Sequence, residues 1–239
     1  MRLSNRIYKL AESVRRGDSV ADIGTDHGYV PMLLVKNGVS PRVIMSDISE
    51  GSLAKALETF MLAGLMDRVD PSDFRVGDGL ETIEAGEVDE VIIAGLGGHT
   101  IAGILAADPE KSRSFSRLIL QPRKHSGSLR YWLYMNGWDI ESEKLAPEGK
   151  FACEIIRAVP GDEVHREAPY PEDDIRWKYP ESLKLAHPDL VLKRIDWKIS
   201  SIQEQIDNLG RASSDSSGRA ERLKKELEYL QDLRKCINA

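Results

Sequence analysis

Hydrophobic positions along the first 160 residues follow two alternating periods. Short runs rich in Val and Ile, typical of buried strands, are separated by longer segments whose apolar residues recur every three or four positions, as in amphipathic helices. Strands are predicted at 19–24, 42–48, 73–78, 89–96, 116–122, 138–146 and 151–159. Helices are predicted at 3–15, 28–37, 50–64, 98–107 and 126–136. This alternation predicts a parallel sheet with helices on both faces.

Two details refine this architecture. The runs at 89–96 and 116–122 are almost continuously apolar, which is typical of central strands covered on both sides. No helical segment separates 138–146 from 151–159, so these two strands are predicted to form an antiparallel hairpin. A parallel sheet that ends in an antiparallel hairpin is the arrangement of the class I methyltransferases. The expected fold is therefore α/β, a class I (Rossmann-like) methyltransferase domain with a seven-stranded sheet.

The pattern changes after residue 160. Residues 161–186 are rich in proline and lack a regular period, which indicates a connector. Beyond it, apolar residues recur at helical spacing in two segments, separated by a Gly- and Ser-rich break at 210–218. These positions are Ile195, Ile199, Ile202, Ile206 and Leu209, followed by Leu223, Leu227, Leu230 and Leu233. We expect a methyltransferase domain at 1–160, a connector at 161–186 and an antiparallel coiled-coil helical hairpin at 187–239.

Composition limits the class of protein. Of 239 residues, 41% are hydrophobic and 30% are charged, which suits a globular core and excludes wholesale disorder. The net charge of −6 excludes a globally basic nucleic-acid binder, although local basic clusters occur. No apolar run reaches the ~18 residues that cross a bilayer, and the N-terminal segment has no export signal. With two cysteines, Cys153 and Cys236, and no zinc-type spacing, we expect reduced thiols, no metal, no membrane contact and a cytoplasmic location.

The first predicted strand runs into a glycine-containing turn at residues 22–28. Gly24 lets a ligand approach the backbone, and the helix that follows offers free N–H groups. Gly24 and Gly28 are four residues apart, which differs from the G-x-G-x-x-G spacing of dinucleotide sites. Asp26 between them would repel a pyrophosphate, but it suits a cationic ligand such as the sulfonium and ammonium groups of S-adenosylmethionine.

Three further strand ends carry related chemistry. Asp47 ends the second strand, 23 residues after Gly24, where an acid can accept hydrogen bonds from ribose hydroxyls. Asp78 stands between two glycines after the third strand and can reach an adenine amino group. Residues 94–98 end the fourth strand in a Gly-rich floor for substrate and methyl donor. The predicted cofactor-binding residues are Asp22, Gly24, Asp26, His27, Gly28, Asp47, Ile48, Asp78, Gly79, Gly95, Leu96 and Gly97.

Taken together, the motifs resemble a known family. They are LSNRI, VADIGTDHGYVP, SDIS, GDGLETI, IIAGLGGHTI, LILQP and LRYWLYMNGW, within a likeness that runs over residues 3–157. This set is similar to the bacterial tRNA adenine-N1-methyltransferases that modify adenine 22, the TrmK family. The resemblance implies S-adenosyl-L-methionine as cofactor, tRNA as acceptor and Asp26 as the family's functional aspartate. The chain departs from the family at Arg123, where the family has Asn after LILQP.

These implications assign roles to individual side chains. Asp26 is expected to be catalytic, stabilising the positive charge that forms on the adenine ring or accepting the N6 proton. The alternative is that Asp26 caps the helix that follows it. Positioning the RNA requires phosphate contacts from Lys and Arg side chains. The predicted RNA-binding residues are Arg2, Arg6, Lys9, Arg123 and Lys124.

Two other functions stay open at this point. A methyltransferase that acts on a small molecule or a protein shares every cofactor feature and differs only in its acceptor. A non-catalytic assembly protein would use the coiled coil as its working part, although Asp26, Asp47 and Asp78 have no purpose in a scaffold. The hairpin suits either RNA contact or dimerisation, so the sequence leaves monomer and homodimer open.

Overall fold

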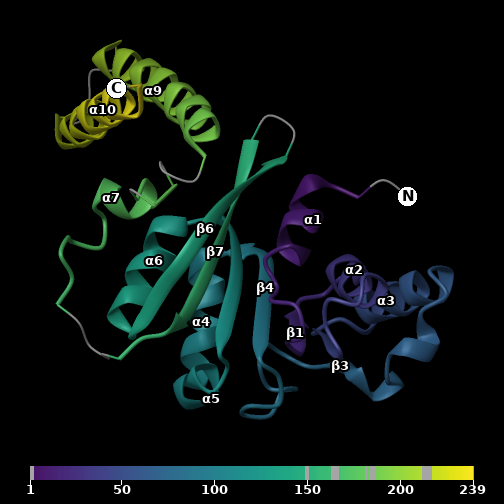
Figure 1. The fold of residues 1–239 in the computed structure, drawn as a ribbon. Helices are drawn as coiled ribbons and strands as arrows, with labels where there is room; N and C mark the ends of the chain where they lie inside the picture. Colours follow the sequence, from purple (N-terminus) through teal and green to yellow (C-terminus); the bar gives the residue numbers. More distant parts are fainter. Residues whose placement is uncertain are drawn as a thin grey trace.

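The computed structural model describes residues 3–148, 151–162, 167–180, 182–183, 187–211 and 217–238. Within them, seven strands form one sheet in the order β3-β2-β1-β4-β5-β7-β6 (Figure 1). The strands are β1 (Val20–Ile23), β2 (Val43–Asp47), β3 (Phe74–Val76), β4 (Glu90–Gly97), β5 (Arg117–Lys124), β6 (Trp138–Glu148) and β7 (Phe151–Pro160). β1 to β5 pair in parallel, whereas β7 runs antiparallel to β5 and β6. The predicted seven-stranded sheet with a terminal hairpin is confirmed.

Helices connect and cover these strands (Figure 1). They are α1 (Asn5–Ala11), α2 (Tyr29–Lys36), α3 (Glu50–Leu62), α4 (Gly98–Ala107), α5 (Pro109–Arg113), α6 (Ser126–Met135), α7 (Ile175–Lys178), α9 (Pro188–Arg211) and α10 (Ser217–Asn238). Two short 3-10 turns, η1 (Met66–Arg68) and η2 (Pro71–Asp73), lie between α3 and β3.

Alternation along the central strands divides the core into two layers. In β4, Val91 and Ile93 pack with residues of α4 and α6, whereas Ile92 between them packs with residues of α1, α2 and α3. All three side chains are fully buried. Successive side chains of a strand point to opposite faces of the sheet. A continuous apolar run therefore belongs to a strand that is covered on both sides, as the sequence predicted.

The carboxyl ends of the parallel strands meet at one edge of the sheet. The connection order reverses there, because β2 and β3 lie on one side of β1 while β4 and β5 lie on the other. Open α/β sheets bind ligands at such a switch point. α1 contacts both α2 and β6 and so passes beside this edge. The topology thus places the predicted acids of β1 and β2 and the glycines of β4 around one space.

The helices α9 and α10 pack side by side and run antiparallel. Ion pairs join Asp196 to Arg234 and Lys198 to Glu226, so positions advance in opposite directions along the two helices. Their predicted apolar seam is buried or half-buried, and the same cluster includes Leu145 of β6. The antiparallel helical hairpin is present and packs against the sheet. Its winding as a coiled coil stays a prediction.

A buried arginine joins α6, the sheet and the C-terminal region. Arg130 of α6 is 1% exposed, and its guanidinium pairs with Glu143 of β6 and Glu154 of β7. The same guanidinium donates to the carbonyl oxygen of Trp177 in α7 at 3.1 Å. Glu154 also pairs with Arg194 of α9. Burial raises the pKa of Glu154, but the two arginines outweigh burial and hold that pKa below its usual range.

The first helix and the third strand are shorter than predicted. The first helix ends at Ala11 instead of continuing to residue 15, because the chain turns toward β1 through Gly17, whose φ is +97°. β3 covers three residues instead of the predicted 73–78. Asp73, which was predicted to begin the strand, lies just before it and forms ion pairs with Arg42 and Arg75.

The short helices α5 and α7 were not predicted. α5 begins at Pro109, and the Asp108 side chain caps it by accepting a hydrogen bond from the Lys111 N–H. The Asp-Pro pair was a visible start signal for this helix. α7 lies inside the predicted irregular connector, where it is held by tertiary contact with Arg130. Four residues are too few to give a helical period in the sequence.

Arg130→Met should lower the free energy of unfolding by roughly 3–5 kcal/mol, because it leaves two buried carboxylates with one partner fewer. Denaturant unfolding followed by circular dichroism measures this change. Arg234→Met is the matched control, since it removes an arginine from an exposed ion pair, and we expect a change below about 1 kcal/mol. Equal stabilities of the two variants would contradict the role given to Arg130.

Candidate active site

A cavity of about 750 Å³ lies at the switch point between β1 and β4. This volume suits a small-molecule or cofactor ligand. Its walls come from α1, from the turn after β1 and from the turns at the ends of β2, β3 and β4. The predicted cofactor residues that line it are Asp22, Gly24, Asp26, His27, Asp47, Ile48, Asp78, Gly79, Gly95 and Leu96.

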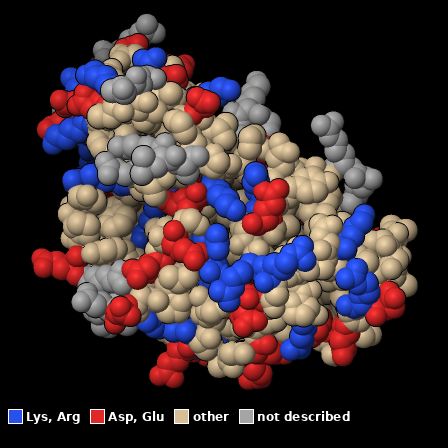
Figure 2. All heavy atoms as spheres, in the orientation of Figure 1, with Lys and Arg blue, Asp and Glu red and all other residues tan. Residues whose placement is uncertain are grey.

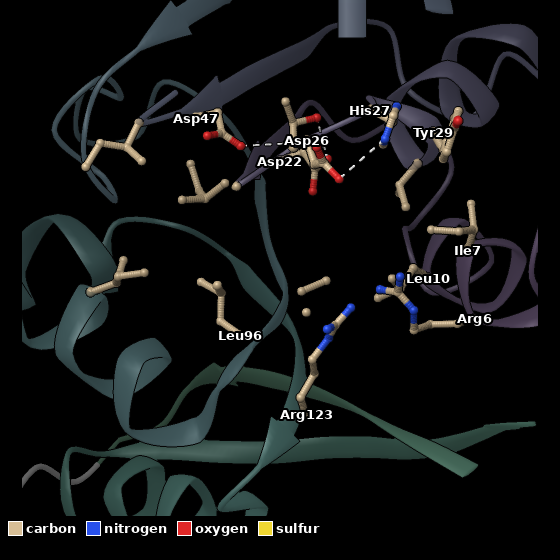
Figure 3. A pocket seen from close by; sticks show the side chains of 18 of the residues that line it. Arg6, Ile7, Leu10, Asp22, Asp26, His27, Tyr29, Asp47, Leu96 and Arg123 are labelled. Carbon is tan, nitrogen blue, oxygen red and sulfur yellow. Dashed lines mark hydrogen bonds and ion pairs between the residues drawn. The ribbon is translucent and has the colours of Figure 1, made fainter. Parts of the chain in front are cut away.

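Opposite charges face each other across this cavity. Figure 3 shows Asp22, Asp26 and Asp47 along one side, with Arg6 and Arg123 on the other. The acids come from the ends of neighbouring strands, whereas the arginines come from α1 and from the end of β5. A ligand that carries both positive and negative groups complements such a cavity.

Asp22 is the buried acid of the site. Asp22 is 5% exposed, and its Oδ2 accepts a hydrogen bond from the Thr25 hydroxyl at 2.8 Å. Burial raises the pKa of Asp22 to about 6, the charge of Asp47 adds to that rise, and the Thr25 hydrogen bond and the Arg6 charge oppose it. A cation beside Asp22 would favour its ionised form, so this carboxyl group suits a positively charged part of a ligand.

Asp26 lies in a turn with unusual backbone geometry. Its φ is +48°, in the left-handed region that Asp tolerates better than most residues with a side chain. Its N–H donates to Oδ2 of Asp47 at 3.1 Å, which holds the turn. Its carboxylate accepts a hydrogen bond from Nζ of Lys55 at 3.2 Å and lies 3.8 Å from Nε2 of His27. α2 begins after Gly28 without a side-chain cap, so the alternative that Asp26 caps this helix is wrong.

The ends of β2 and β3 supply the far wall. Asp47 accepts a hydrogen bond from the Ser49 N–H at 2.9 Å, in addition to the bond from the turn after β1. Ile48 is 70% exposed and gives the cavity an apolar surface. Asp78 is exposed at the cavity, and Gly79 beside it has a φ of +52°. One wall therefore combines carboxylates with an apolar side chain, a combination that suits a nucleoside.

Two predicted cofactor residues lie away from the cavity. Gly28 packs against α3, where a Cβ would stand 2.9 Å from the Cβ of Ala56. Gly97 ends β4, where a Cβ would stand 3.5 Å from Cε of Lys124. Close packing explains why the turn needs Gly28, and neither glycine lines the cavity.

Arg6 is held at the cavity from two sides. Its Nε pairs with Glu148 at 3.2 Å, and its Nη1 donates to Oε1 of Gln121 at 3.3 Å. Gln121 is fully buried in β5, and its side-chain Nε2 donates to the carbonyl oxygen of Pro122 at 3.1 Å. A Cβ on Gly95 would stand 3.9 Å from Nη1 of Arg6 and 3.8 Å from Nε of Arg123. The glycine at this position leaves room for both guanidinium groups.

The other predicted RNA-binding residues fall in separate places. Lys9 pairs with Glu12 at 2.7 Å and does not line the cavity. Lys124 lines a second cavity, and Arg2 lies outside the described residues. The sequence predicted that Arg6 and Lys9 share one surface, but of these two residues only Arg6 lines the cavity.

Helix α1 supplies cavity residues that sequence reasoning missed. Ile7 and Leu10 of this helix line the cavity together with Leu3, which lies two residues before the helix begins, and the three follow a helical spacing. That spacing marks an apolar face in the sequence, but it does not tell a ligand from a protein core. Tyr29 also lines the cavity and stacks on His27, with ring centroids 5.1 Å apart.

Within the described residues, neither a metal centre nor a membrane span accompanies the cavity. No group of three or more His, Cys, Asp or Glu side chains in this part of the chain converges to hold a metal ion. None of the described helices is long and apolar enough to cross a bilayer. Cys153 and Cys236 carry free thiols.

Comparisons with known proteins agree with this geometry. The family described as "Methyltransferase domain" matches residues 3–156. The chain is 37% identical over 170 residues to the Bacillus subtilis tRNA (adenine(22)-N(1))-methyltransferase, and the match covers 71% of this chain and 69% of that protein. The crystal structure of the B. subtilis M1A22 tRNA methyltransferase TrmK is 29% identical, with a TM-score of 0.69 and coverage of 99% of this chain and 97% of that chain.

A third similarity concerns the fold alone. The crystal structure of a Streptococcus pneumoniae protein in complex with S-adenosyl-L-methionine has a TM-score of 0.82 at 23% identity, and the match covers 98% of this chain and 100% of that chain. The family match spans all of the sheet up to β7 and every turn that lines the cavity. This chain therefore belongs to the methyltransferase-domain family, and within it to the tRNA (adenine(22)-N(1))-methyltransferases.

Proposed function

We propose that this protein transfers a methyl group from S-adenosylmethionine to N1 of adenine 22 in tRNA. The observation that carries the proposal is the switch-point cavity, in which Asp22, Asp26 and Asp47 face Arg6 and Arg123, in a chain of this family. The cavity supplies complementary charge for the cofactor, and its arginine side offers an approach for an anionic acceptor. The proposed catalytic unit is residues 1–160.

The residues of the cavity fit S-adenosylmethionine by charge. The bound cofactor supplies an electrophilic methyl group on a sulfonium. Asp22 complements the positive sulfonium and ammonium groups, and Arg6 complements the carboxylate at the same end of the cofactor. This use of Arg6 differs from the phosphate contact predicted for it, because its guanidinium is held inside the cavity by Glu148 and Gln121.

The same cavity also fits the nucleoside part of the cofactor. Gly24 has a φ of +73°, and a Cβ there would meet nothing within 4 Å, so a ligand can lie directly on this backbone. Asp47 would accept hydrogen bonds from the ribose hydroxyls, and Ile48 would pack against the adenine ring. Asp78 would accept a hydrogen bond from the adenine amino group. Gly95 and Leu96 form the floor below the reacting atoms.

Adenine N1 needs positioning more than activation. Its lone pair lies in the ring plane and is already nucleophilic, so aligning it with the methyl group supplies most of the acceleration. The ring becomes positively charged after transfer. The Asp26 carboxylate, fixed by Lys55 and near His27, stabilises that charge or accepts the N6 proton.

The acceptor must present its Watson–Crick edge. A paired adenine has to be flipped or locally unpaired before N1 can react. Arg123 and Lys124 at the end of β5 contact phosphates on this side of the cavity, and Lys9 on the outer face of α1 extends that contact. Arg123 cannot replace the acceptor oxygen of the family's Asn, because a guanidinium only donates hydrogen bonds. A phosphate contact therefore suits Arg123 better than reading of a base edge.

Label from S-adenosylmethionine is expected in 1-methyladenosine when the protein is incubated with unmodified bacterial tRNA and the RNA is digested to nucleosides. The matched control is the same tRNA with guanosine at position 22, which should stay unlabelled. Calorimetry with the cofactor alone measures binding separately. Cofactor binding without label in tRNA would overturn the proposed acceptor and leave a small molecule or a protein as the substrate.

Asp26→Asn should lower kcat by about 100-fold or more while the cofactor affinity stays nearly unchanged, because the side chain keeps its size but loses its charge. Asn also tolerates the positive φ of this position, so backbone strain does not enter the comparison. Single-turnover methylation and calorimetry provide the two readouts. A kcat equal to that of the unaltered protein would remove Asp26 from the chemistry.

Asp22 should make cofactor binding depend on pH. Because its pKa is about 6 in the ligand-free protein, the carboxyl group loses its charge as the pH falls through 6, and affinity should fall toward tenfold per pH unit below that point. Asp22→Asn should bind the cofactor weakly and without this pH dependence.

Asp22→Asn should also stabilise the ligand-free protein at pH 7.5, by about 3 kcal/mol. The pKa of Asp22 in the folded protein lies above its ordinary value of 3.8, so ionisation of this carboxyl group opposes folding above pH ~4. At pH 4 the two proteins should be equally stable. An unaltered pH dependence of cofactor binding in Asp22→Asn would contradict this assignment.

A further inference from the structure

A second cavity lies between the catalytic domain and the helical hairpin. It has a volume of about 730 Å³ and is lined by the end of β5, the first turn of α6, α7 and α9. Arg123 lines this cavity as well as the cofactor cavity, so the two spaces adjoin. The second cavity has no part in the proposed cofactor binding, because Asp22, Asp26 and Asp47 line only the first cavity.

The second cavity has unbalanced positive charge. Arg123, Lys124 and Lys178 line it, and within the described residues none of the three forms an ion pair. The acids that line it, Glu148 and Glu154, are each already paired with arginine. Figure 2 shows Lys and Arg side chains across the middle of one face of the molecule, below the helical hairpin, with Asp and Glu side chains among them. A cavity of this charge, in a chain with a net charge of −6, favours an anion.

Contacts within the protein fix the position of Lys178. It lies in α7, and Arg130 fixes that helix through the carbonyl oxygen of Trp177 at 3.1 Å. The Trp177 side chain is buried, and its Nε1 donates to the Pro171 carbonyl oxygen at 3.0 Å. A Cβ on Gly127 would stand 2.9 Å from Cγ of Lys178, so the lysine stem lies directly on the first turn of α6. The first part of the Lys178 side chain is therefore fixed against α6, at the wall of the cavity.

The first turn of α6 adds to the same potential. This helix has ten residues, and its N-cap residue, His125, has a φ of +58° and makes no side-chain cap. Residues 125–128 line the cavity, so the free N–H groups of this helix end face it. The helix end alone identifies no ligand, but it reinforces the charge of the three unpaired cations.

The hairpin completes the cavity. Arg194 and Trp197 of α9 both line it. Arg194 is fixed by its ion pair with Glu154 and lies 5.0 Å from the centre of the Tyr179 ring. Trp197 is 60% exposed and adds an aromatic surface. Cations along a groove together with an aromatic ring are the features by which proteins bind single-stranded nucleic acid.

We propose that the second cavity binds a phosphodiester of the acceptor RNA next to the target adenosine. The site takes its cations from β5 and α7 and its outer wall from α9, so it is incomplete without the hairpin. Lys124 and Lys178 bind the phosphate as point charges, and the adjoining Arg123 lies between this phosphate and the cofactor cavity. The proposal rests on the proposed function for the identity of the RNA, whereas the phosphate contact itself needs no particular base.

The test compares the salt dependence of RNA binding between the unaltered protein and three variants. Lys178→Gln removes the proposed contact, and Lys178→Arg retains its charge. Arg176→Gln is the matched control, because Arg176 lies in the same helix but is paired with Asp174 and does not line the cavity. Fluorescence anisotropy with unmodified tRNA, and separately with polyuridylate, gives the affinity at several KCl concentrations. Calorimetry with S-adenosylmethionine checks the first cavity.

Lys178→Gln should weaken binding of both RNAs about threefold to tenfold near 0.1 M salt and reduce the slope of log affinity against log salt by about one. Cofactor affinity should stay unchanged, and Lys178→Arg and Arg176→Gln should bind as the unaltered protein does. Affinity and slope of Lys178→Gln equal to those of Arg176→Gln would overturn the site. Displacement of tRNA by polyglutamate as effectively as by polyuridylate would also overturn it, in favour of an acidic protein partner.

The methylation assay separates this proposal from the proposed function. Methylation of adenine 22 with no effect of Lys178→Gln on RNA binding would leave the function intact and reject the phosphate site. A Lys178-dependent salt slope with polyuridylate, in a protein that does not methylate tRNA, would support the phosphate site and reject the proposed acceptor.

Discussion

The active site depends on holding together carboxylates that repel one another. β1 and β2 are adjacent parallel strands, so the acids at their ends are forced to one edge of the sheet. Burial and the charge of Asp47 both raise the pKa of Asp22, so ionisation of this group opposes folding near neutral pH. The two apolar layers of the sheet must offset that opposition. A bound cation relieves it, which links cofactor binding to stability.

Most of the fold and part of the site could be predicted from the sequence. Apolar runs and helical segments alternate clearly, and a parallel topology places strand ends at one edge whatever the details of the helices. Asp22 and Asp47 were therefore predictable, because each is tied to a strand end. The position of Arg6 at the cofactor cavity was not predicted, because a helix distributes its side chains around a full circle and the sequence does not show which side faces the ligand. Lys178 was missed because α7 has only four residues, too few to give a helical period, and is placed by tertiary contacts such as the one with Arg130.

The departure at Arg123 becomes intelligible from strand geometry. β5 continues to Lys124, two residues beyond its predicted end at Pro122, so Arg123 and Lys124 are successive residues of one strand. Side chains of successive strand residues point to opposite faces. Lys124 accordingly lines the second cavity, whereas the Arg123 side chain borders the cofactor cavity and reaches both. A long guanidinium side chain can adjoin two spaces in this way, and the shorter Asn of the family has less reach.

The buried arginine network explains how these two cavities keep a fixed relation. Replacing a whole buried ion network by apolar residues is often neutral or stabilising, so general stability is a weak reason for Arg130 to be there. Its geometric effect is larger, because one guanidinium holds β6, β7 and α7 together while Glu154 also holds α9. The surface that carries Lys178 and the hairpin is thereby fixed relative to the strand ends. Methyl transfer to N1 depends on alignment, and a misplacement of about 1 Å is enough to slow such a reaction severely. A rigid surface at the second cavity therefore suits the proposed RNA contact better than a freely moving clamp would.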